Sequence, residues 1–250
     1  MIFLKNLFIC IYIYMSFEKK YLKYKEKYYN LKKIINQKGG DNHIKPLTDE
    51  EREEAFNRMD DYYDFSIEPL NVRADKEVAL IAVKIWGLWL SQTTNELKKD
   101  KDVVLEAISS DAYAIEFASD ELKRDRDVVL AAVESNGYTL ELAHPTLQDD
   151  ETVVLTAIEG VRKFVDGTVE YPNSYPEYVL EFTSERLRKQ RNVVLAAVQM
   201  EPHELQFALG NLNDDEEIAT IAIRNYGETL EYVSDRLKQN RDLVSIAIQQ

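Results

Sequence analysis

Residues 125–133 read DRDVVLAAV, and this stretch decides the fold because similar stretches recur along the chain at a fixed step. Each copy has a polar first residue, two mostly charged residues and six mostly apolar positions. The copies start 25 residues apart, except for one step of 40. Such self-similarity predicts a repeat architecture. The other copies are 75–83 DKEVALIAV, 100–108 DKDVVLEAI, 150–158 DETVVLTAI, 190–198 QRNVVLAAV, 215–223 DEEIATIAI and 240–248 NRDLVSIAI.

Each copy predicts a short helix that begins at its polar residue. Aspartate or asparagine opens most copies and is a good N-cap, and an acid often follows two positions later, where the helix dipole favours it. One position holds alanine in every copy, which predicts close contact between neighbouring helices. These alanines are Ala82, Ala107, Ala132, Ala157, Ala197, Ala222 and Ala247.

A second motif lies between the copies, for example AIEFASDEL at 114–122, and its closing leucines keep a fixed offset. The apolar spacing of Ile115, Ala118 and Leu122 predicts a second helix in each repeat, ending in basic residues. Gly87, Gly137, Gly227 and Pro202 mark the turn between the two helices. Residues 59–74 are interpreted as a degenerate leading half-repeat, with Ile67 and Val72 near the leucine positions.

These patterns predict an all-α fold, an α-solenoid of roughly seven 25-residue helix pairs over residues 59–250. Helices of about 10–12 residues do not persist alone in water, so they must stack on their neighbours. Stacked helix pairs form extended concave and convex surfaces. The long step of 40 places an insertion at about residues 160–174.

Charge divides the chain into a basic arm and an acidic body. The net charge is −14 overall, with +7 on residues 1–40 and −21 on the remainder. Residues 1–15 are an apolar leader, interpreted either as an over-extended start before Met15 or as a signal anchor, and their apolar run is too short to span a bilayer. Residues 16–40 predict a basic amphipathic helix that docks on a partner or on an anionic surface, or packs on this chain. Residues 41–58 predict an acidic linker that leads into a short helix, with TDEE at 48–51 as a capping box.

The insertion at 160–174 is the candidate partner-binding segment, through Arg162, Lys163, Phe164 and Tyr171. Loops on a repeat scaffold often carry recognition. The alternative is a neutral surface insertion, because long insertions cost little free energy.

Nothing in the sequence predicts a catalytic, cofactor or metal site, and we expect no enzyme activity. His43, His144 and His203 are scattered, and the single cysteine, Cys10, has no catalytic partner. Their spacing matches no zinc site. The acidic clusters at 149–151 and 214–217 lack the glycine turn of a calcium loop, so helix starts explain them better.

The repeat pattern D-x-x-VVLAAV…NG-x-x-L-x-x-A-S-x-x-L resembles the family called domain of unknown function 4116, over roughly residues 59–250. The resemblance implies a helical repeat found largely in giant DNA viruses and some protists and bacteria, with no established activity. The segment Met15–Gly40 also resembles an N-terminal segment common among giant-virus proteins.

We therefore expect a non-enzymatic protein–protein interaction or scaffold module of viral origin, located in the host cytoplasm or the virion. An acidic body suits a basic protein or peptide partner and argues against nucleic acid. The alternative is a membrane-associated viral or host-interaction protein anchored through its N-terminus. Apolar residues Leu243, Ile246 and Ile248 end the repeats. They predict either docking on another chain, including self-association, or descent from a truncated ancestor.

Overall fold

The computed structural model describes residues 45–59, 64–166 and 178–249, and these residues form helices and no strand, which confirms the all-α prediction. The chain divides into compact units at Met1–Lys45 and Pro46–Gln250, and the second is described below. Its α-helices are α2 (Asp49–Arg58), α3 (Leu70–Arg73), α4 (Lys76–Ile85), α5 (Lys101–Ser110), α6 (Arg126–Ser135), α7 (Pro145–Gln148), α8 (Glu151–Asp166), α9 (Arg191–Met200), α10 (Glu216–Asn225), α11 (Asp235–Lys238) and α12 (Arg241–Ile248).

The long helix of each repeat begins where the sequence predicts. Asp100 caps α5, because its side chain accepts hydrogen bonds from the backbone N–H groups of Asp102 and Val103 at 3.1 and 3.3 Å. Five other first residues make the same pair of bonds, so the cap is a constant feature of the repeat. They are Asp75, Asp125, Asp150, Asp215 and Asn240.

The second half of each repeat differs from the single helix that the sequence predicts, because it forms two short helical turns. After α5, for example, η4 (Ala112–Phe117) and η5 (Leu122–Arg124) are 3₁₀ segments, with Ala118 extended between them at φ −65° and ψ 155°. Ser119 causes the break, because its hydroxyl accepts a hydrogen bond from the Leu122 N–H at 3.4 Å and starts a new turn. The other 3₁₀ segments are η1 (Phe65–Ile67), η2 (Gly87–Gln92), η3 (Leu97–Lys99), η6 (Gly137–Leu142), η7 (Leu180–Phe182), η8 (Leu187–Lys189), η9 (Pro202–Phe207), η10 (Leu212–Asp214) and η11 (Gly227–Glu231).

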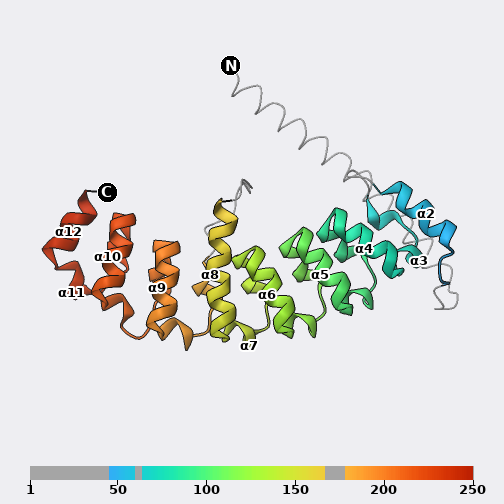
Figure 1. Ribbon diagram of the computed structural model, residues 1–250. Coiled ribbons are helices and arrows are strands. Elements are labelled where there is room, and N and C mark those ends of the chain that lie inside the picture. The colour runs from blue at the N-terminus through green and yellow to red at the C-terminus, as the bar shows by residue number, and fades with distance from the viewer. Residues whose placement is uncertain (1–44, 60–63, 167–177, 250) are drawn as a thin grey trace, which may run out of the picture. The chain divides into compact units, whose positions relative to one another are not determined.

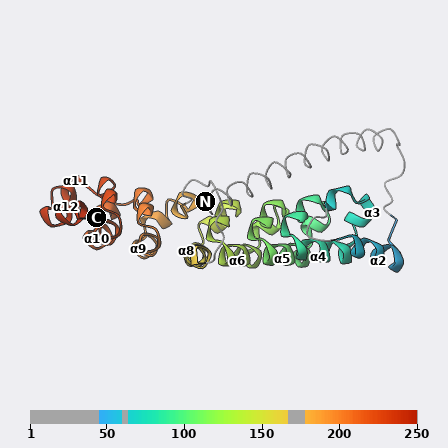
Figure 2. The ribbon, with the colours of Figure 1, turned by 90° about the horizontal axis from the view of Figure 1, so that it is seen from above.

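The long helices stack in chain order, each in contact with the next (Figure 1). Seen from above, α4, α5, α6 and α8 stand in one row (Figure 2). One backbone hydrogen bond recurs at the junctions between repeats, from a residue two or three positions beyond the first 3₁₀ segment to a carbonyl of the preceding repeat. These bonds are Ser119 N–Lys98 O, His144 N–Lys123 O, Ser184 N–Gln148 O, Leu209 N–Arg188 O and Ser234 N–Asn213 O, at 2.9–3.1 Å.

Small residues allow this close stacking. A Cβ atom added to Gly137 would lie 1.9 Å from the backbone oxygen of Ala157 on the next helix, and one added to Gly87 would lie 2.3 Å from that of Ala107. The alanine position itself is fully buried from Ala82 to Ala222. The close contact predicted from the alanines is therefore present, and the turn glycines face them.

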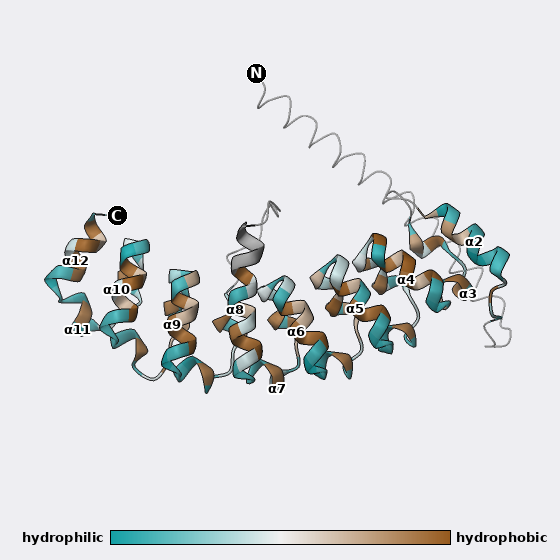
Figure 3. Ribbon diagram, in the orientation of Figure 1, coloured by the Kyte–Doolittle hydropathy of each residue, from teal (hydrophilic) through white to brown (hydrophobic). Residues whose placement is uncertain are grey.

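Apolar side chains form one core that continues from repeat to repeat, from Ala79 to Leu243. Each helix carries a hydrophobic stripe beside hydrophilic positions (Figure 3). Leu90 and Ile115 occupy the same position in successive repeats, later repeats hold leucine there, and Phe65 holds it before the first repeat. All of these side chains are fully buried except that of Leu230 in the last of these repeats. Phe65 thus continues the 25-residue register, a feature that the sequence analysis missed.

The folded unit begins earlier than residue 59, because helix α2 lies in the segment expected as a linker. Thr48 and Glu51 form the expected capping box. Ala55 of α2 is buried in a second apolar cluster with Phe65, Val72 and Trp89. In the predicted half-repeat Val72 is therefore a core residue, whereas Ile67 is 52% exposed.

Helix α8 is 16 residues long, whereas α4, α5, α6, α9 and α10 have ten each. The start of the predicted insertion therefore continues this helix as far as Asp166. Gly160 lets the extra turns lie against α6, since a Cβ atom there would be 1.9 Å from the carbonyl oxygen of Val133.

Candidate partner-binding surface

Ion pairs across the junctions use many of the charged side chains. Lys76 Nζ lies 2.8 Å from Asp100 and 2.9 Å from Asp102. The basic first residues of α5, α6 and α9 repeat this contact with the cap residue of the next long helix. Arg52 of α2 takes the same role toward Asp75, at 2.9 Å. The equivalent pairs are Lys101–Asp125, Arg126–Asp150 and Arg191–Asp215.

These pairs keep the cap carboxylates ionised. The hydrogen bond from Lys101 lowers the pKa of Asp125 and outweighs the opposite effect of burial. Arg126 and Arg191 likewise lower the pKa of Asp150 and Asp215. The cap aspartates therefore start their own helices, as the sequence predicts, and also pair with the preceding helix, which the sequence did not predict.

Two junctions carry a different set of polar residues. Helices α8 and α10 begin with an acid, Glu151 and Glu216, and the N-cap positions of the following long helices hold the neutral amides Gln190 and Asn240. An aspartate cap there would face another carboxylate, so the neutral amide avoids repulsion. At these two junctions the ion pair lies elsewhere, because an arginine of the following repeat pairs with an aspartate just before α8 or α10. The pairs are Arg186 with Asp149 and Arg236 with Asp214, both at 2.9 Å.

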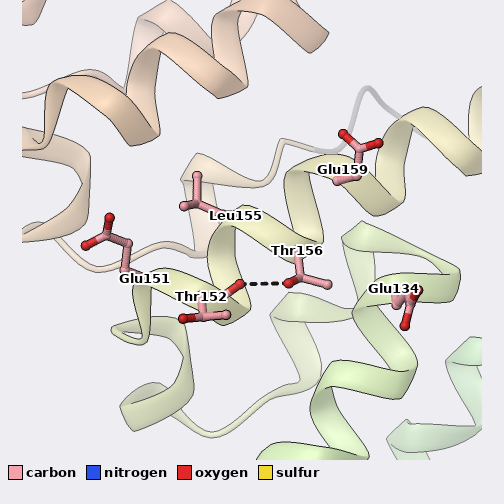
Figure 4. A pocket seen from close by; sticks show the side chains of 6 residues that line it. All are labelled: Glu134, Glu151, Thr152, Leu155, Thr156 and Glu159. Atoms are coloured by element: carbon pink, nitrogen blue, oxygen red, sulfur yellow. Dashed lines mark hydrogen bonds between the residues drawn. The ribbon is translucent and has the colours of Figure 1, made fainter.

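An open hollow of about 520 Å³ lies on α8 (Figure 4). Five of its lining residues come from α8 and one, Glu134, from α6. Leu155 gives it an apolar patch. The residues that line it are Glu134, Glu151, Thr152, Leu155, Thr156 and Glu159.

The helix surface beside the hollow continues its acidic character. Thr152 lines the hollow, and the same helix position holds Asp102 on α5 and Asp127 on α6. Both side chains are 78% exposed. We call the hollow together with these two exposed aspartates the acidic helix face.

The predicted insertion begins at the edge of this hollow, because Glu159 lines it and Gly160 follows. Arg162, Lys163 and Phe164 lie in the last turns of α8. Tyr171 lies outside the described residues. Partner binding through these four residues stays a prediction.

The histidines serve local structure where they are described. His144 caps α7, with the Thr146 N–H 3.3 Å from its Nδ1. His203 lies between two carboxylates, with Nδ1 2.7 Å from Glu201 and Nε2 3.0 Å from Glu228 of the next repeat. Burial alone would lower the pKa of His203, but these two hydrogen bonds raise it above its ordinary value. His43 lies outside the described residues.

Glu204 is a buried acid that the sequence analysis missed. It is 4% exposed, and its carboxylate accepts hydrogen bonds from the N–H groups of Val179 and Leu180 at 2.7 and 3.0 Å. Burial raises the pKa of Glu204 to about 8, against the effect of these bonds. Thr229 occupies the position of Val179 two repeats later, and its N–H bonds to the carbonyl of Tyr226 in its own turn rather than to a side chain. Glu204 therefore secures the first described residues after 167–177.

Metal sites and membrane-spanning helices are both absent from the part of the chain that the structure describes. No group of three or more His, Cys, Asp or Glu side chains there could hold a metal ion. In the same part of the chain, no helix combines the length and apolar character needed to cross a membrane.

The fold and its junctions define an all-α protein made of repeated helical elements that stack in chain order. The chain belongs to the family described as Domain of unknown function (DUF4116), which matches residues 75–123, 125–164 and 215–250, half of its length. The matched segments leave out 165–214, where most of the insertion and the fifth copy lie. Neither a curated protein nor a solved structure matches the chain.

Proposed function

We propose that this chain is a non-enzymatic protein–protein interaction module that binds a basic protein segment on its acidic helix face. The hollow on α8 carries the proposal, because Glu134, Glu151 and Glu159 surround an apolar patch at Leu155. This arrangement suits a lysine or arginine side chain, whose apolar stem covers Leu155 while its charged end meets the carboxylates.

The distribution of charge supports this assignment. The cap aspartates are already paired with lysine or arginine across the junctions. Asp102 and Asp127 extend the face along α5 and α6; each is paired with one junction lysine, and each carboxylate is still strongly exposed. A surface of one charge sign attracts a partner of the other and speeds their association.

We interpret the stacked repeats as an α-solenoid, an architecture whose extended surfaces bind proteins and peptides. Arg162, Lys163 and Phe164 follow the hollow on the same helix, so the insertion offers a second contact for the same partner. The resemblance of Met15–Gly40 to giant-virus proteins supports a viral origin. A module of this origin would act in the host cytoplasm or in the virion.

The proposal is tested by titrating the full chain with fluorescent decalysine and decaglutamate peptides at low and at high salt. We expect decalysine to bind and decaglutamate not to bind, with affinity falling as salt screens the charges. The double variant Glu134→Gln/Glu159→Gln should lower the affinity about three- to tenfold. The control Glu53→Gln/Glu54→Gln removes two exposed charges from α2 and should change the affinity less than about twofold.

Two results would overturn the proposal. One is that decalysine does not bind at low salt. The other is that both double variants weaken binding equally, because the peptide would then respond to net charge rather than to the face on α8.

A further inference from the structure

Two adjacent residues of η9 bond to the 3₁₀ segments on either side. His203 bonds forward to Glu228 of η11, with its Nε2 3.0 Å from the carboxylate. Glu204 bonds backward to the N–H groups of Val179 and Leu180 at the start of η7, at 2.7 and 3.0 Å. One 3₁₀ segment therefore joins three successive repeats through two titratable side chains, which we call the η9 pair.

The forward contact of His203 needs a proton. Its Nδ1 lies 2.7 Å from Glu201 and its Nε2 3.0 Å from Glu228, so a carboxylate stands at each ring nitrogen. The rings of Tyr226 and Tyr232 also face the imidazole, with centroids 5.1 and 6.3 Å away. A neutral imidazole has one N–H donor, whereas the imidazolium has two. Only the protonated ring can therefore donate to both carboxylates.

The backward contact of Glu204 also favours a proton. The side chain is buried, and the charged groups that act on it, Glu201 and Glu181, are themselves acids. Tyr178, just before η7, lies within electrostatic reach of the same carboxyl group. Burial raises the pKa of Glu204 to about 8, because the ionised form would lose water and meet like charges. The folded chain therefore holds this proton into the neutral range.

Other repeats carry different side chains at the positions of the η9 pair. Tyr113 and Ala114 occupy them on η4, and Tyr138 and Thr139 occupy them on η6. Alanine and threonine do not titrate, and tyrosine as a residue type titrates far above neutral pH. The response to pH near neutrality is therefore a property of η9 and not of the repeat in general.

We propose that the η9 pair is a pH-dependent joint, which holds η7, η9 and η11 together in mildly acid solution and loosens them in mildly alkaline solution. As the pH rises, His203 loses its second N–H donor. Glu204 becomes a buried carboxylate, which regains water only if η9 and η7 separate.

The two effects have the same sign. Both groups have a raised pKa in the folded chain, so each stabilises the joint at low pH and loses that contribution as the pH rises. The loss for Glu204 falls between pH 4.5 and about 8, and the loss for His203 begins at about pH 6.5. Neither residue lines the hollow on α8, so this inference is independent of the proposed basic partner.

Hydrogen–deuterium exchange of the full chain, read by mass spectrometry at about pH 6 and about pH 8.5, tests the joint, because these values enclose most of the titration. Labelling times are scaled for the chemical exchange rate at each pH. We expect peptides from 178–187 and 226–233 to lose protection about five- to thirtyfold at the higher pH. Peptides from 101–135 should keep theirs, since the pKa of Lys101 is raised and that of Asp125 lowered, so this pair stays charged.

The chain itself supplies matched variants. His203→Tyr/Glu204→Thr places on η9 the side chains that η6 carries, and it should abolish the pH effect in both peptides. His203→Tyr alone should abolish the change at 226–233, and Glu204→Gln alone the change at 178–187. The control His144→Ser replaces another histidine by the residue found at the equivalent Ser119, and it should leave both changes in place.

Three results would overturn the inference. One is equal protection at the two pH values in either wild-type peptide, because that contact would then hold without its proton. Another is a loss of protection spread evenly over all repeats, because the pH would then act on the whole fold. The third is a pH effect that persists in the double variant, because other groups would then carry it.

Discussion

Lys101 Nζ lies 2.8 and 3.0 Å from the two carboxylate oxygens of Asp125, so the first residue of α5 bonds to the residue that caps α6. Asp125 also accepts hydrogen bonds from the N–H groups of Asp127 and Val128. One carboxylate thus starts its own helix and joins it to the helix before. This double use explains why charge and repeat register coincide in the sequence.

Substitutions at Lys101 and Asp125 should convert the α5–α6 junction, which pairs a lysine with an aspartate cap, into the acid–amide type found between α10 and α12. Lys101→Glu alone places a third acid beside Asp125 and Asp127, so we expect a lower midpoint in urea unfolding, followed by circular dichroism. Adding Asp125→Asn recreates the acid–amide combination of Glu216 and Asn240 and should recover at least about half of the loss. A double variant no more stable than Lys101→Glu would show that the two residues are not coupled.

Gly137 should not tolerate a side chain, because a Cβ atom would lie 1.9 Å from the backbone oxygen of Ala157. We expect Gly137→Ala to lower the free energy of unfolding by about 1–3 kcal/mol. Ala112 at the same position of the preceding repeat shows that a junction can shift to admit a methyl group, so the protein should still fold. Ser135→Ala, at an exposed site on α6, is the control and should leave the urea midpoint unchanged.

Glu204 should make stability depend on pH. The folded chain keeps the Glu204 proton up to a pKa of about 8, whereas the unfolded chain loses it near the ordinary value of 4.5. The folded state binds more protons between these values, so stability falls as pH rises through this window. We expect Glu204→Gln to make the free energy of unfolding depend less on pH. The variant also loses one of the two oxygen acceptors, which should lower the free energy of unfolding by about 1–3 kcal/mol at pH 5. An unchanged slope in urea unfolding from pH 5 to 8 would contradict this role.

His203 should titrate above its ordinary value because Glu201 and Glu228 both bond to its ring. We expect Glu228→Gln to lower the pKa of His203, measured from the ring proton shifts by NMR. The raised pKa stabilises the folded state below pH 6.5, and this contribution is lost as pH rises through the folded value. Glu231→Gln, a change of the same kind in the same 3₁₀ segment, should leave the His203 titration in place.

Much of the fold was predictable from sequence because the signals repeat. Each long helix begins at its predicted cap, and the alanines are buried as expected. The second half of the repeat was not predicted, because the apolar spacing of Ile115, Ala118 and Leu122 also fits one continuous helix. Ser119, Ser184 and Ser234 each accept a hydrogen bond from the N–H three residues later, which is itself a start signal.

The candidate surface was less predictable than the fold. Glu134 and Glu159 occupy equivalent positions on α6 and α8, but their convergence on one hollow depends on how closely α8 packs against α6. Gly160 permits that contact. It lies in the segment that the sequence assigns to the insertion, so its role in helix packing was not predicted. Glu204 carried a clearer signal, since it is an acid at the position of Ala114, Thr139 and Thr229.

The central claim is that the cap aspartates join the helices, whereas the acids that line the hollow on α8 bind a basic partner. The affinity of decalysine for Asp100→Asn/Asp125→Asn tests it most directly, beside Glu134→Gln/Glu159→Gln. Each double variant removes two negative charges, and asparagine caps a helix about as well as aspartate. We predict that the cap variant keeps the wild-type affinity, whereas the hollow variant loses about three- to tenfold. An affinity that falls as much for the cap variant as for the hollow variant would contradict the claim.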